Sequence, residues 1–321
     1  MERKQAPAVS VPDHSIIKNP DLFSGFFCVE IDYNKDRKRG RDMVQIVYLD
    51  ADGTLFHHEG YIPKSAFEAI RKAQEKGIKI VLCTGRQLVE IYGDMKKIDY
   101  DAVIAGAGGT VLVKEELLFD GRFSQEELER LRQYLERFRI PAVYESREGV
   151  FGDRYTKNAM KERLDLVCAG MSEKERKEHG MNLFYESVEQ MDMEKIMQRP
   201  VSKISFLQTE KPYSEIYEDL HDAFDLIRAT FAPLGPESGE IGCRGISKAA
   251  GMEIVEKYFG IDRQDTAAIG DGENDLCMFE HAGVAIAMGN APDRVKEKAG
   301  WVTTGIDQDG IFNAFEHLGL F

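Results

Sequence analysis

The chain has 321 residues, of which 43% are hydrophobic and 31% charged, and these values predict a folded protein of about two domains and exclude a disordered chain. It lacks both a run of about 18 apolar residues and the apolar stretch of a secretory signal, and its net charge of −14 opposes binding to nucleic acid or anionic membranes. The five cysteines are odd in number and scattered, as in reduced cytosolic proteins, so we expect a cytoplasmic protein that binds neither nucleic acid nor membrane.

Residues 1–42 carry several prolines, an apolar patch and a basic run. We expect them to form an N-terminal extension, partly ordered, ahead of the first strand.

The first strand is predicted where the apolar run from Val44 to Leu49 stops at two carboxylates, Asp50 and Asp52, followed by Gly53. In open parallel sheets, ligands bind outside the carboxyl ends of the strands. Two carboxylates this close repel each other unless a cation or a shared proton relieves them. The stretch therefore predicts either a Mg²⁺ site with a free carboxylate for chemistry, or a simple turn after a strand.

Helices and strands then alternate, which predicts a parallel sheet with right-handed crossovers. Three strands are expected to end in polar or glycine-rich turns at one edge of this sheet. The predicted elements are a helix over Pro63–Gly77, a strand over Ile78–Cys83 followed by Thr84-Gly85-Arg86, a helix over Gln87–Met95, and a strand over Ala102–Ala105 followed by Gly106–Gly109.

The pattern changes at Ser124, which forms a capping box with Glu127 at the start of an amphipathic helix that Pro141 ends. Strands over Ala142–Tyr144 and Lys203–Leu207 and a helix over Glu215–Phe224 follow. We predict an inserted α+β domain over residues 123–240, with residues 43–122 and 241–321 forming the core.

The α/β alternation resumes after Gly245. The predicted elements are a helix over Ile246–Tyr258, a strand over Thr266–Ile269 followed by Gly270-Asp-Gly-Glu-Asn-Asp275, a strand over Val284–Met288, and a closing helix over Gly310–Leu318.

Four pieces of the sequence together resemble motifs I to IV of the haloacid dehalogenase (HAD) superfamily of aspartate-based phosphotransferases. They are Asp50-Ala-Asp-Gly-Thr-Leu55, Thr84, Lys248 and Gly270–Asp275. In addition, the run Ala282–Ala291 is similar to the corresponding segment of the Cof-type branch of this superfamily. The resemblance implies a Rossmann-like parallel sheet with helices on both faces. Because only one helix and one strand fit between motifs I and II, the long segment before motif III implies an α+β cap of type 2.

Two positions depart from the pattern of the family. Ala51 stands where a bulkier residue is common, and Ala107-Gly108-Gly109 stands where relatives often carry Asn-Gly. The second departure puts in doubt any substrate contact that the missing Asn would make.

The resemblance implies a phosphatase in which Asp50 attacks phosphorus and forms an aspartyl-phosphate. Asp52 would protonate the leaving group and then activate water. Thr84 and Lys248 complete the catalytic group. The Thr84 hydroxyl and the Gly85 amide, at the start of a helix, would hold phosphoryl oxygens, and Lys248 would offset negative charge.

The resemblance also implies bound Mg²⁺, which prefers oxygen ligands. Asp50, the carbonyl of Asp52 and Asp271 would hold it, with Asp275 orienting these ligands. Asn274 would bind phosphate or join the site network.

The substrate would be a small phosphorylated metabolite, most simply a sugar phosphate, and the protein a monomer or homodimer. A hexose phosphomutase and a non-catalytic phosphometabolite-binding protein are the alternatives. Arg86 is either a substrate contact or structural. The polar residues of the insertion that are candidates to line the pocket are Glu145, Arg147, Asp153 and Arg154.

Overall fold

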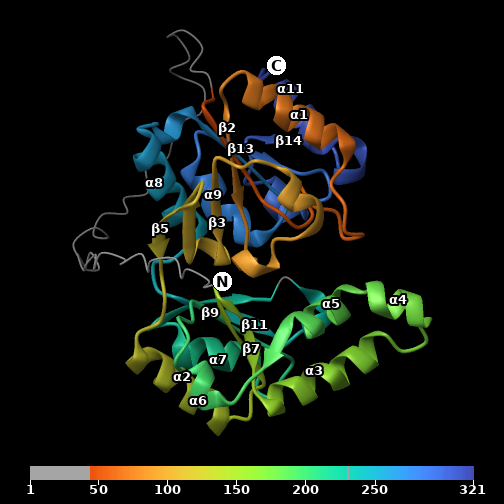
Figure 1. Ribbon diagram of the computed structural model, residues 1–321, viewed down its shortest axis with the longest axis vertical. Helices are drawn as coiled ribbons and strands as arrows, with labels where there is room; N and C mark the ends of the chain where they lie inside the picture. Colours follow the sequence, from red (N-terminus) through yellow and green to blue (C-terminus); the bar gives the residue numbers. More distant parts are fainter. Residues whose placement is uncertain (1–43, 230) are drawn as a thin grey trace, which may run out of the picture. The chain divides into compact units, whose positions relative to one another are not determined.

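The computed structural model describes residues 44–229 and 231–321. The N-terminal extension expected over residues 1–42 lies outside them. Within the described residues one sheet, called here the core sheet, has eight strands (Figure 1). In sheet order they are β14 (Trp301–Val302), β13 (Val284–Ala287), β12 (Thr266–Gly270), β1 (Ile46–Leu49), β2 (Lys79–Cys83), β3 (Ala102–Ala105), β4 (Thr110–Val113) and β5 (Glu116–Asp120).

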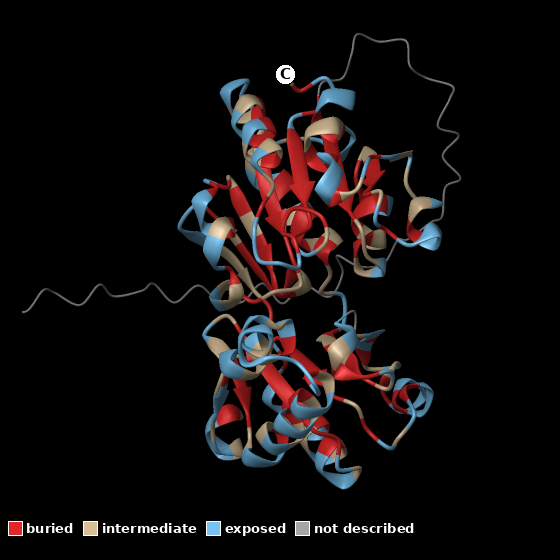
Figure 2. Cartoon of the chain, turned by 90° about the vertical axis from the view of Figure 1, so that its right-hand side faces the viewer, coloured by how far each residue is buried: buried red, intermediate tan, exposed pale blue. Residues whose placement is uncertain are grey.

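The strand β1 is buried on both sides, which explains its uninterrupted apolar sequence. Val47 and Leu49 pack in a cluster with α1 and α11, whereas Ile46 and Tyr48 pack in a second cluster with α8 and α9. Helices therefore cover both faces, as the sequence predicts, and Figure 2 shows the buried residues concentrated on the strands. The helices of the core are α1 (Lys64–Glu75), α8 (Lys248–Phe259), α9 (Leu276–His281), α10 (Asp293–Lys296) and α11 (Gly310–His317).

The strands from β14 to β3 are parallel, but β4 and β5 add an antiparallel hairpin at the edge that the sequence analysis missed. Its turn contains Lys114, whose φ of 53° is left-handed, a conformation for which lysine gives no signal in the sequence.

The predicted helix over Gln87–Met95 is wrong. Two 3₁₀ helices stand there instead, η2 (Leu88–Glu90) and η3 (Gly93–Lys97). Ile91 is extended between them and Gly93 has a φ of 59°. The Glu90 carboxylate also accepts a hydrogen bond from the Gln87 amide, so η2 is a single capped turn.

A second sheet, called here the cap sheet, has six strands within the described residues. In sheet order they are β10 (Phe224–Arg228), β11 (Gly239–Cys243), β9 (Lys203–Phe206), β6 (Ala142–Ser146), β7 (Gly149–Gly152) and β8 (Val188–Gln190). The helices of this region are α2 (Gln125–Arg137), α3 (Arg154–Val167), α4 (Glu173–Glu178), α5 (Gly180–Ser187), α6 (Met193–Ile196) and α7 (Tyr213–Leu220).

The predicted capping box at the start of α2 is confirmed: the Ser124 side chain accepts from the Glu127 amide, and the Glu127 carboxylate accepts from the Ser124 amide. The helix predicted over Glu215–Phe224 is wrong at its end, because Phe224 begins β10. The strand β11 runs across the expected boundary at residue 240, so the exact limits of the inserted domain stay a prediction.

Helices α2, α6 and α7 pack on one face of the cap sheet, while α3 and α5 pack on part of the other, around Val143 and Val150. The observed fold is therefore an α/β core with an inserted α+β cap, as predicted from the sequence.

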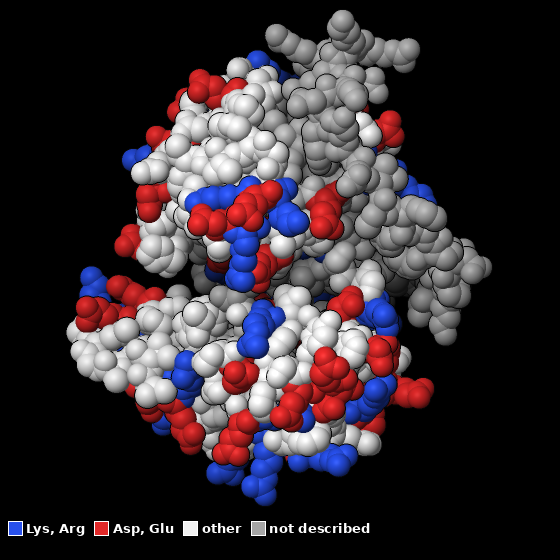
Figure 3. All heavy atoms as spheres, turned by 180° about the vertical axis from the view of Figure 1, so that it is seen from behind, with Lys and Arg blue, Asp and Glu red and all other residues white. Residues whose placement is uncertain are grey.

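Among the described residues, none of the helices has the length and apolar character needed to span a membrane. The face in Figure 3 carries acidic and basic side chains interspersed among the described residues.

Candidate active site

The carboxylates of Asp50 and Asp52 both follow β1 but lie in different environments. Asp50 is 4% exposed, and its amide donates to the Ile269 carbonyl of β12, which fixes the end of the strand. The side chain of Asp52 is 57% exposed. Burial and the nearby charge of Asp275 raise the pKa of Asp50, although Lys248 opposes them.

Lys248 lies between two buried carboxylates. It is the first residue of α8, which Ser247 caps, and its Nζ donates to Asp50 and to Asp275 at 2.6 Å each. Burial disfavours its charged form, but Asp275 and Asp50 outweigh that effect and raise the pKa of Lys248. A lysine that the sequence would otherwise assign to a helix surface is therefore a buried cation next to Asp50.

Asp275 organises the turn after β12. Its Oδ2 accepts from the amides of Asp271 and Gly272 at 3.0 and 2.9 Å, while Lys248 takes its Oδ1. With no exposed side-chain surface, Asp275 thus ties the helix α8 to the loop that carries Asp271. Asn274 lies on the same turn, η7 (Glu273–Asp275).

Asp271 lies where two loops meet the end of β1. Thr54 donates to its Oδ1 at 3.3 Å and Asn290 to its Oδ2 at 3.2 Å. Asn290 also donates to the Gly53 carbonyl at 2.8 Å. Asn290 follows β13 and is not among the site residues expected from the sequence. Burial, followed by the charge of Asp275, raises the pKa of Asp271 to about 6.

Oxygen atoms of Asp50, Asp271 and Asp275 all lie within 4.8 Å of one another. Three carboxylates held this close with one lysine leave excess negative charge, and burial, followed by the charge of Asp275, raises the pKa of both Asp50 and Asp271. Hard oxygen donors of this kind fit Mg²⁺. The Asp52 side chain points to a different partner, so its predicted part in metal binding would involve its backbone carbonyl alone.

Gly53 is required by the close approach of these loops. Its φ is +83°, and a Cβ atom there would lie 2.2 Å from Asp271 Oδ2. Any other residue would displace Asp271 from the three-carboxylate cluster.

Arg86 forms a two-pronged ion pair with Asp52. Its Nε and Nη2 donate to the two carboxylate oxygens at 2.8 and 2.7 Å, and its Nη1 donates to the Glu90 carbonyl. The guanidinium also stacks on Phe56 and Tyr92, with 5.2 and 5.0 Å to the ring centroids. Burial opposes its charge, but Asp52 raises the pKa of Arg86. Arg86 is thus held as a partner of Asp52.

Thr84 and Gly85 form the turn after β2. The Thr84 hydroxyl accepts from the Arg86 amide at 3.1 Å, and the Gly106 amide donates to the Arg86 carbonyl at 2.7 Å, which ties this turn to the one after β3. Because the expected helix is absent here, the Gly85 amide lacks the α-helix N-terminus that the sequence analysis assigned to it.

A group of charged residues of the cap sheet contacts this turn. Lys203 Nζ donates to the Gly85 carbonyl at 3.2 Å and lies 3.0 Å from Glu145 and 3.2 Å from Glu240. Ser205 donates to Glu145. Burial raises the pKa of Glu145 to about 7, with Lys203 acting against it. We call Glu145, Lys203, Ser205 and Glu240 the cap-side cluster.

Of the four polar cap residues named from the sequence, only Glu145 belongs to this cluster. Arg147 pairs with Asp120 at 3.1 Å, Asp153 caps α3 through the Thr156 amide, and Arg154 begins α3. Lys203 and Glu240 were missed, because only the register of β6, β9 and β11 brings them together.

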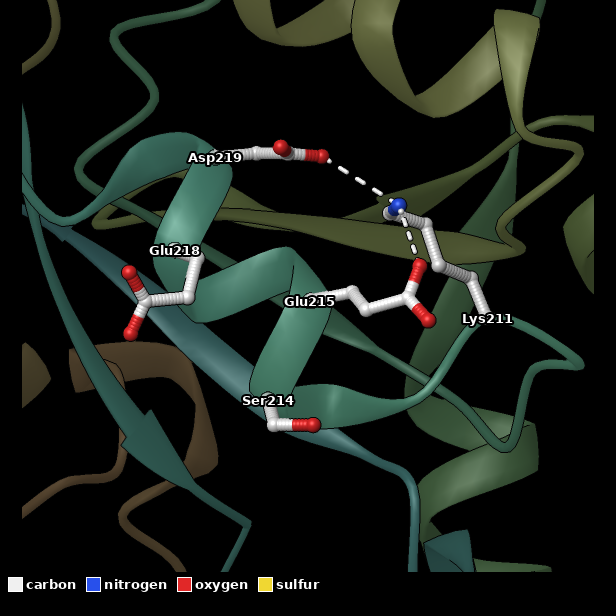
Figure 4. A pocket seen from close by; sticks show the side chains of 5 residues that line it. All are labelled: Lys211, Ser214, Glu215, Glu218 and Asp219. Carbon is white, nitrogen blue, oxygen red and sulfur yellow. Dashed lines mark hydrogen bonds and ion pairs between the residues drawn. The ribbon is translucent and has the colours of Figure 1, made fainter.

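A surface pocket of about 230 Å³ lies elsewhere, on α7 (Figure 4). Lys211 pairs there with Glu215 at 3.1 Å and Asp219 at 3.3 Å. None of the site residues predicted from the sequence lines this pocket. Lys211 is thus a second lysine held by two carboxylates.

A family model for haloacid dehalogenase-like hydrolases matches residues 47–315. The chain belongs to this family. A Bacillus subtilis relative, the 5-amino-6-(5-phospho-D-ribitylamino)uracil phosphatase YcsE, is 26% identical over 86% of this chain and 96% of its own length.

Solved structures agree with this assignment. The phosphatase BT1666 from Bacteroides thetaiotaomicron is 26% identical, with a TM-score of 0.73 over 88% of this chain and 98% of its own. The HAD subclass IIB sugar phosphatase BT4131 is 25% identical, with a TM-score of 0.70 over 86% of this chain and 100% of its own. The prediction of a Cof-type phosphoric monoester hydrolase is confirmed.

Proposed function

We propose that this chain is a Mg²⁺-dependent phosphatase that hydrolyses a small phosphorylated metabolite, most simply a sugar phosphate, through an aspartyl-phosphate on Asp50. The observation that carries the proposal is the contrast between Asp50 and Asp52. Two carboxylates two residues apart have different surroundings, one buried beside Lys248 and the other exposed and paired with Arg86, and this difference supports separate roles for them.

For the first step Asp52 must carry a proton on an oxygen that no longer accepts from Arg86; Asp50 then attacks phosphorus and the leaving oxygen takes that proton. In the second step Asp52 removes a proton from water, which attacks phosphorus and releases Asp50. The Thr84 hydroxyl and the Gly85 amide bind phosphoryl oxygens, and Lys248 offsets their charge.

The metal ligands would be Asp50, Asp271 and the Asp52 carbonyl. Bound Mg²⁺ supplies positive charge that lets the anionic substrate approach Asp50. Asp275 holds Asp271 and Lys248 in place, and Asn274 contributes to the phosphate side of the site.

Metal removal tests the proposal directly. We expect the purified chain to release phosphate from p-nitrophenyl phosphate in Mg²⁺, EDTA to abolish this release, and excess Mg²⁺ to restore it. Screening sugar phosphates, nucleotides, flavin mononucleotide and pyridoxal phosphate then ranks substrates by kcat/KM. Binding of Mg²⁺ without hydrolysis of any of these compounds would instead support a non-catalytic binding protein.

Arg86→Lys is expected to reduce the efficiency of Asp52, because an ammonium group cannot hold both carboxylate oxygens in one plane. We expect kcat to fall about 10-fold or more for hexyl phosphate, whose alkoxide must be protonated as it leaves. The loss should be smaller for p-nitrophenyl phosphate, whose leaving group is a stable anion. Steady-state kinetics on both substrates measure the difference.

Arg132→Lys is the matched control, because Arg132 makes a similar two-pronged pair with Glu129 on the cap helix α2. It should leave both activities unchanged. Equal losses on the two substrates in Arg86→Lys would contradict a role in leaving-group protonation.

The phosphomutase alternative requires the site to hold a second phosphate of a sugar bisphosphate. The cap-side cluster has two carboxylates and one lysine, and that lysine already forms two ion pairs and one hydrogen bond. This charge disfavours a second phosphate there. The name of the relative YcsE indicates that its substrate carries a phosphorylated ribityl chain. For the present chain this also favours a phosphorylated polyol over a sugar bisphosphate as the substrate.

A further inference from the structure

The cap-side cluster shares one face of the cap sheet with the buried apolar residues Val143 and Val150. Glu145 lies two residues after Val143 on β6 and therefore on the same face, and it stands opposite Lys203 in the register of β6 and β9. Helices α3 and α5 pack around Val143, but the next positions along these strands carry charges. Burying ionised groups costs free energy that well-packed apolar residues would avoid. We therefore expect the buried charges of Glu145 and Lys203 to have a role other than packing.

The cluster lies beside the turn that binds phosphate in the proposed mechanism. Lys203 Nζ is 3.2 Å from the carbonyl of Gly85, and Gly85 adjoins Thr84. A leaving group attached to phosphate at this turn would therefore meet the cap-side cluster.

The polar contacts within the cap-side cluster show which of its side chains has an atom free to bind the leaving group. Lys203 Nζ donates a hydrogen bond to the Gly85 carbonyl and forms ion pairs with Glu145 and Glu240, so it already has three partners for its three N–H groups. Both oxygens of Glu145 have partners, Lys203 and Ser205. Among residues 44–229 and 231–321, Oε1 of Glu240 has no hydrogen-bond partner, and this side chain is 19% exposed.

We infer that Glu240 accepts a hydrogen bond from a hydroxyl group of the leaving group, and that Lys203 is the positioning residue that holds it there. The inference rests on the proposed phosphatase function and narrows its substrate class to phosphorylated polyols and sugars. An ionised carboxylate only accepts hydrogen bonds, so it favours leaving groups with hydroxyls and disfavours anionic ones.

Two probes of equal chain length test this inference: sorbitol 6-phosphate carries hydroxyl groups and hexyl phosphate does not. We expect the wild type to prefer sorbitol 6-phosphate. Glu240→Ala should lower the ratio of kcat/KM for sorbitol 6-phosphate to that for hexyl phosphate by about 10- to 100-fold, mainly through KM, as expected for a lost charge-assisted hydrogen bond. Glu240→Gln, which keeps an acceptor oxygen, should give an intermediate ratio.

Glu240→Ala should fold, because Lys203 keeps Glu145 and the Gly85 carbonyl as partners. Glu215→Ala is the matched control: Glu215 also pairs with a cap lysine, but in the α7 pocket (Figure 4), so the ratio should not change. The inference about Glu240 is overturned if Glu240→Ala leaves the ratio of the two kcat/KM values unchanged, or if the wild type does not prefer sorbitol 6-phosphate. Neither result would contradict the proposed phosphatase function. A wild type that hydrolyses neither probe nor p-nitrophenyl phosphate overturns the proposed function itself.

Discussion

Replacing Asp50 with Asn should abolish turnover without loss of the fold. An amide oxygen is a poor nucleophile, and removing the nucleophile from an enzyme that forms a covalent intermediate costs about 10⁴-fold or more in kcat. Initial rates with p-nitrophenyl phosphate in saturating Mg²⁺ measure this loss.

The same variant should be at least as stable as the wild type without divalent metal. The folded-state pKa of Asp50 is raised by burial and by Asp275, so at pH 7 its ionised form is less favourable in the folded than in the unfolded chain. Removing this charge therefore removes a destabilising contribution, which urea unfolding in EDTA detects. Near wild-type turnover in Asp50→Asn would refute the assignment of the nucleophile, and a lower stability would contradict the electrostatic account.

Replacing Lys248 with Met should damage both stability and activity. The substitution leaves the carboxylates of Asp50 and Asp275 buried without their cation, and breaking a buried ion pair on one side costs about 3–5 kcal/mol. The charge that offsets the phosphoryl group is lost as well, so we expect kcat to fall about 10³-fold. Urea unfolding at pH 7 and single-turnover kinetics on the folded fraction measure the two effects.

Lys211→Met is the control for this prediction. Lys211 also pairs with two carboxylates, but those of Glu215 and Asp219 are 61% and 43% exposed, so solvent can stabilise them when the lysine is removed. We expect a free-energy change of about 1 kcal/mol or less and unchanged turnover. If the two variants lost equal stability, burial of the Lys248 cluster would not be the cause.

The central strands and the order of the catalytic turns could be predicted from the sequence, because buried parallel strands are apolar runs that stop at polar residues. The family resemblance then selected Lys248 and Asp271, which are far from Asp50 along the chain. In the structure Lys248 donates hydrogen bonds to both Asp50 and Asp275. The chemical roles of these residues stay predictions to be tested.

The contacts between loops could not be predicted, because they depend on where side chains point. The pairing of Arg86 with Asp52 follows from an extended turn where we expected a helix, and one glycine, Gly93, with a positive φ helps to break that helix. Lys203 and Glu240 are separated from Gly85 by most of the cap sequence, and their proximity depends on strand register. Alternation within one strand predicts the face on which a residue lies, but the register between strands also depends on turn geometry.

The position of β1 in the core sheet has a consequence for the synthesis of the protein. Its neighbours are β2, which follows directly, and β12, which is made only after the whole cap sheet. On the ribosome, the strand that carries Asp50 therefore keeps one unpaired edge while the cap is being translated, and such edges invite pairing with other chains. The exposure lasts until β12 has been synthesised, so the length of the insertion sets how long this edge of β1 stays unpaired.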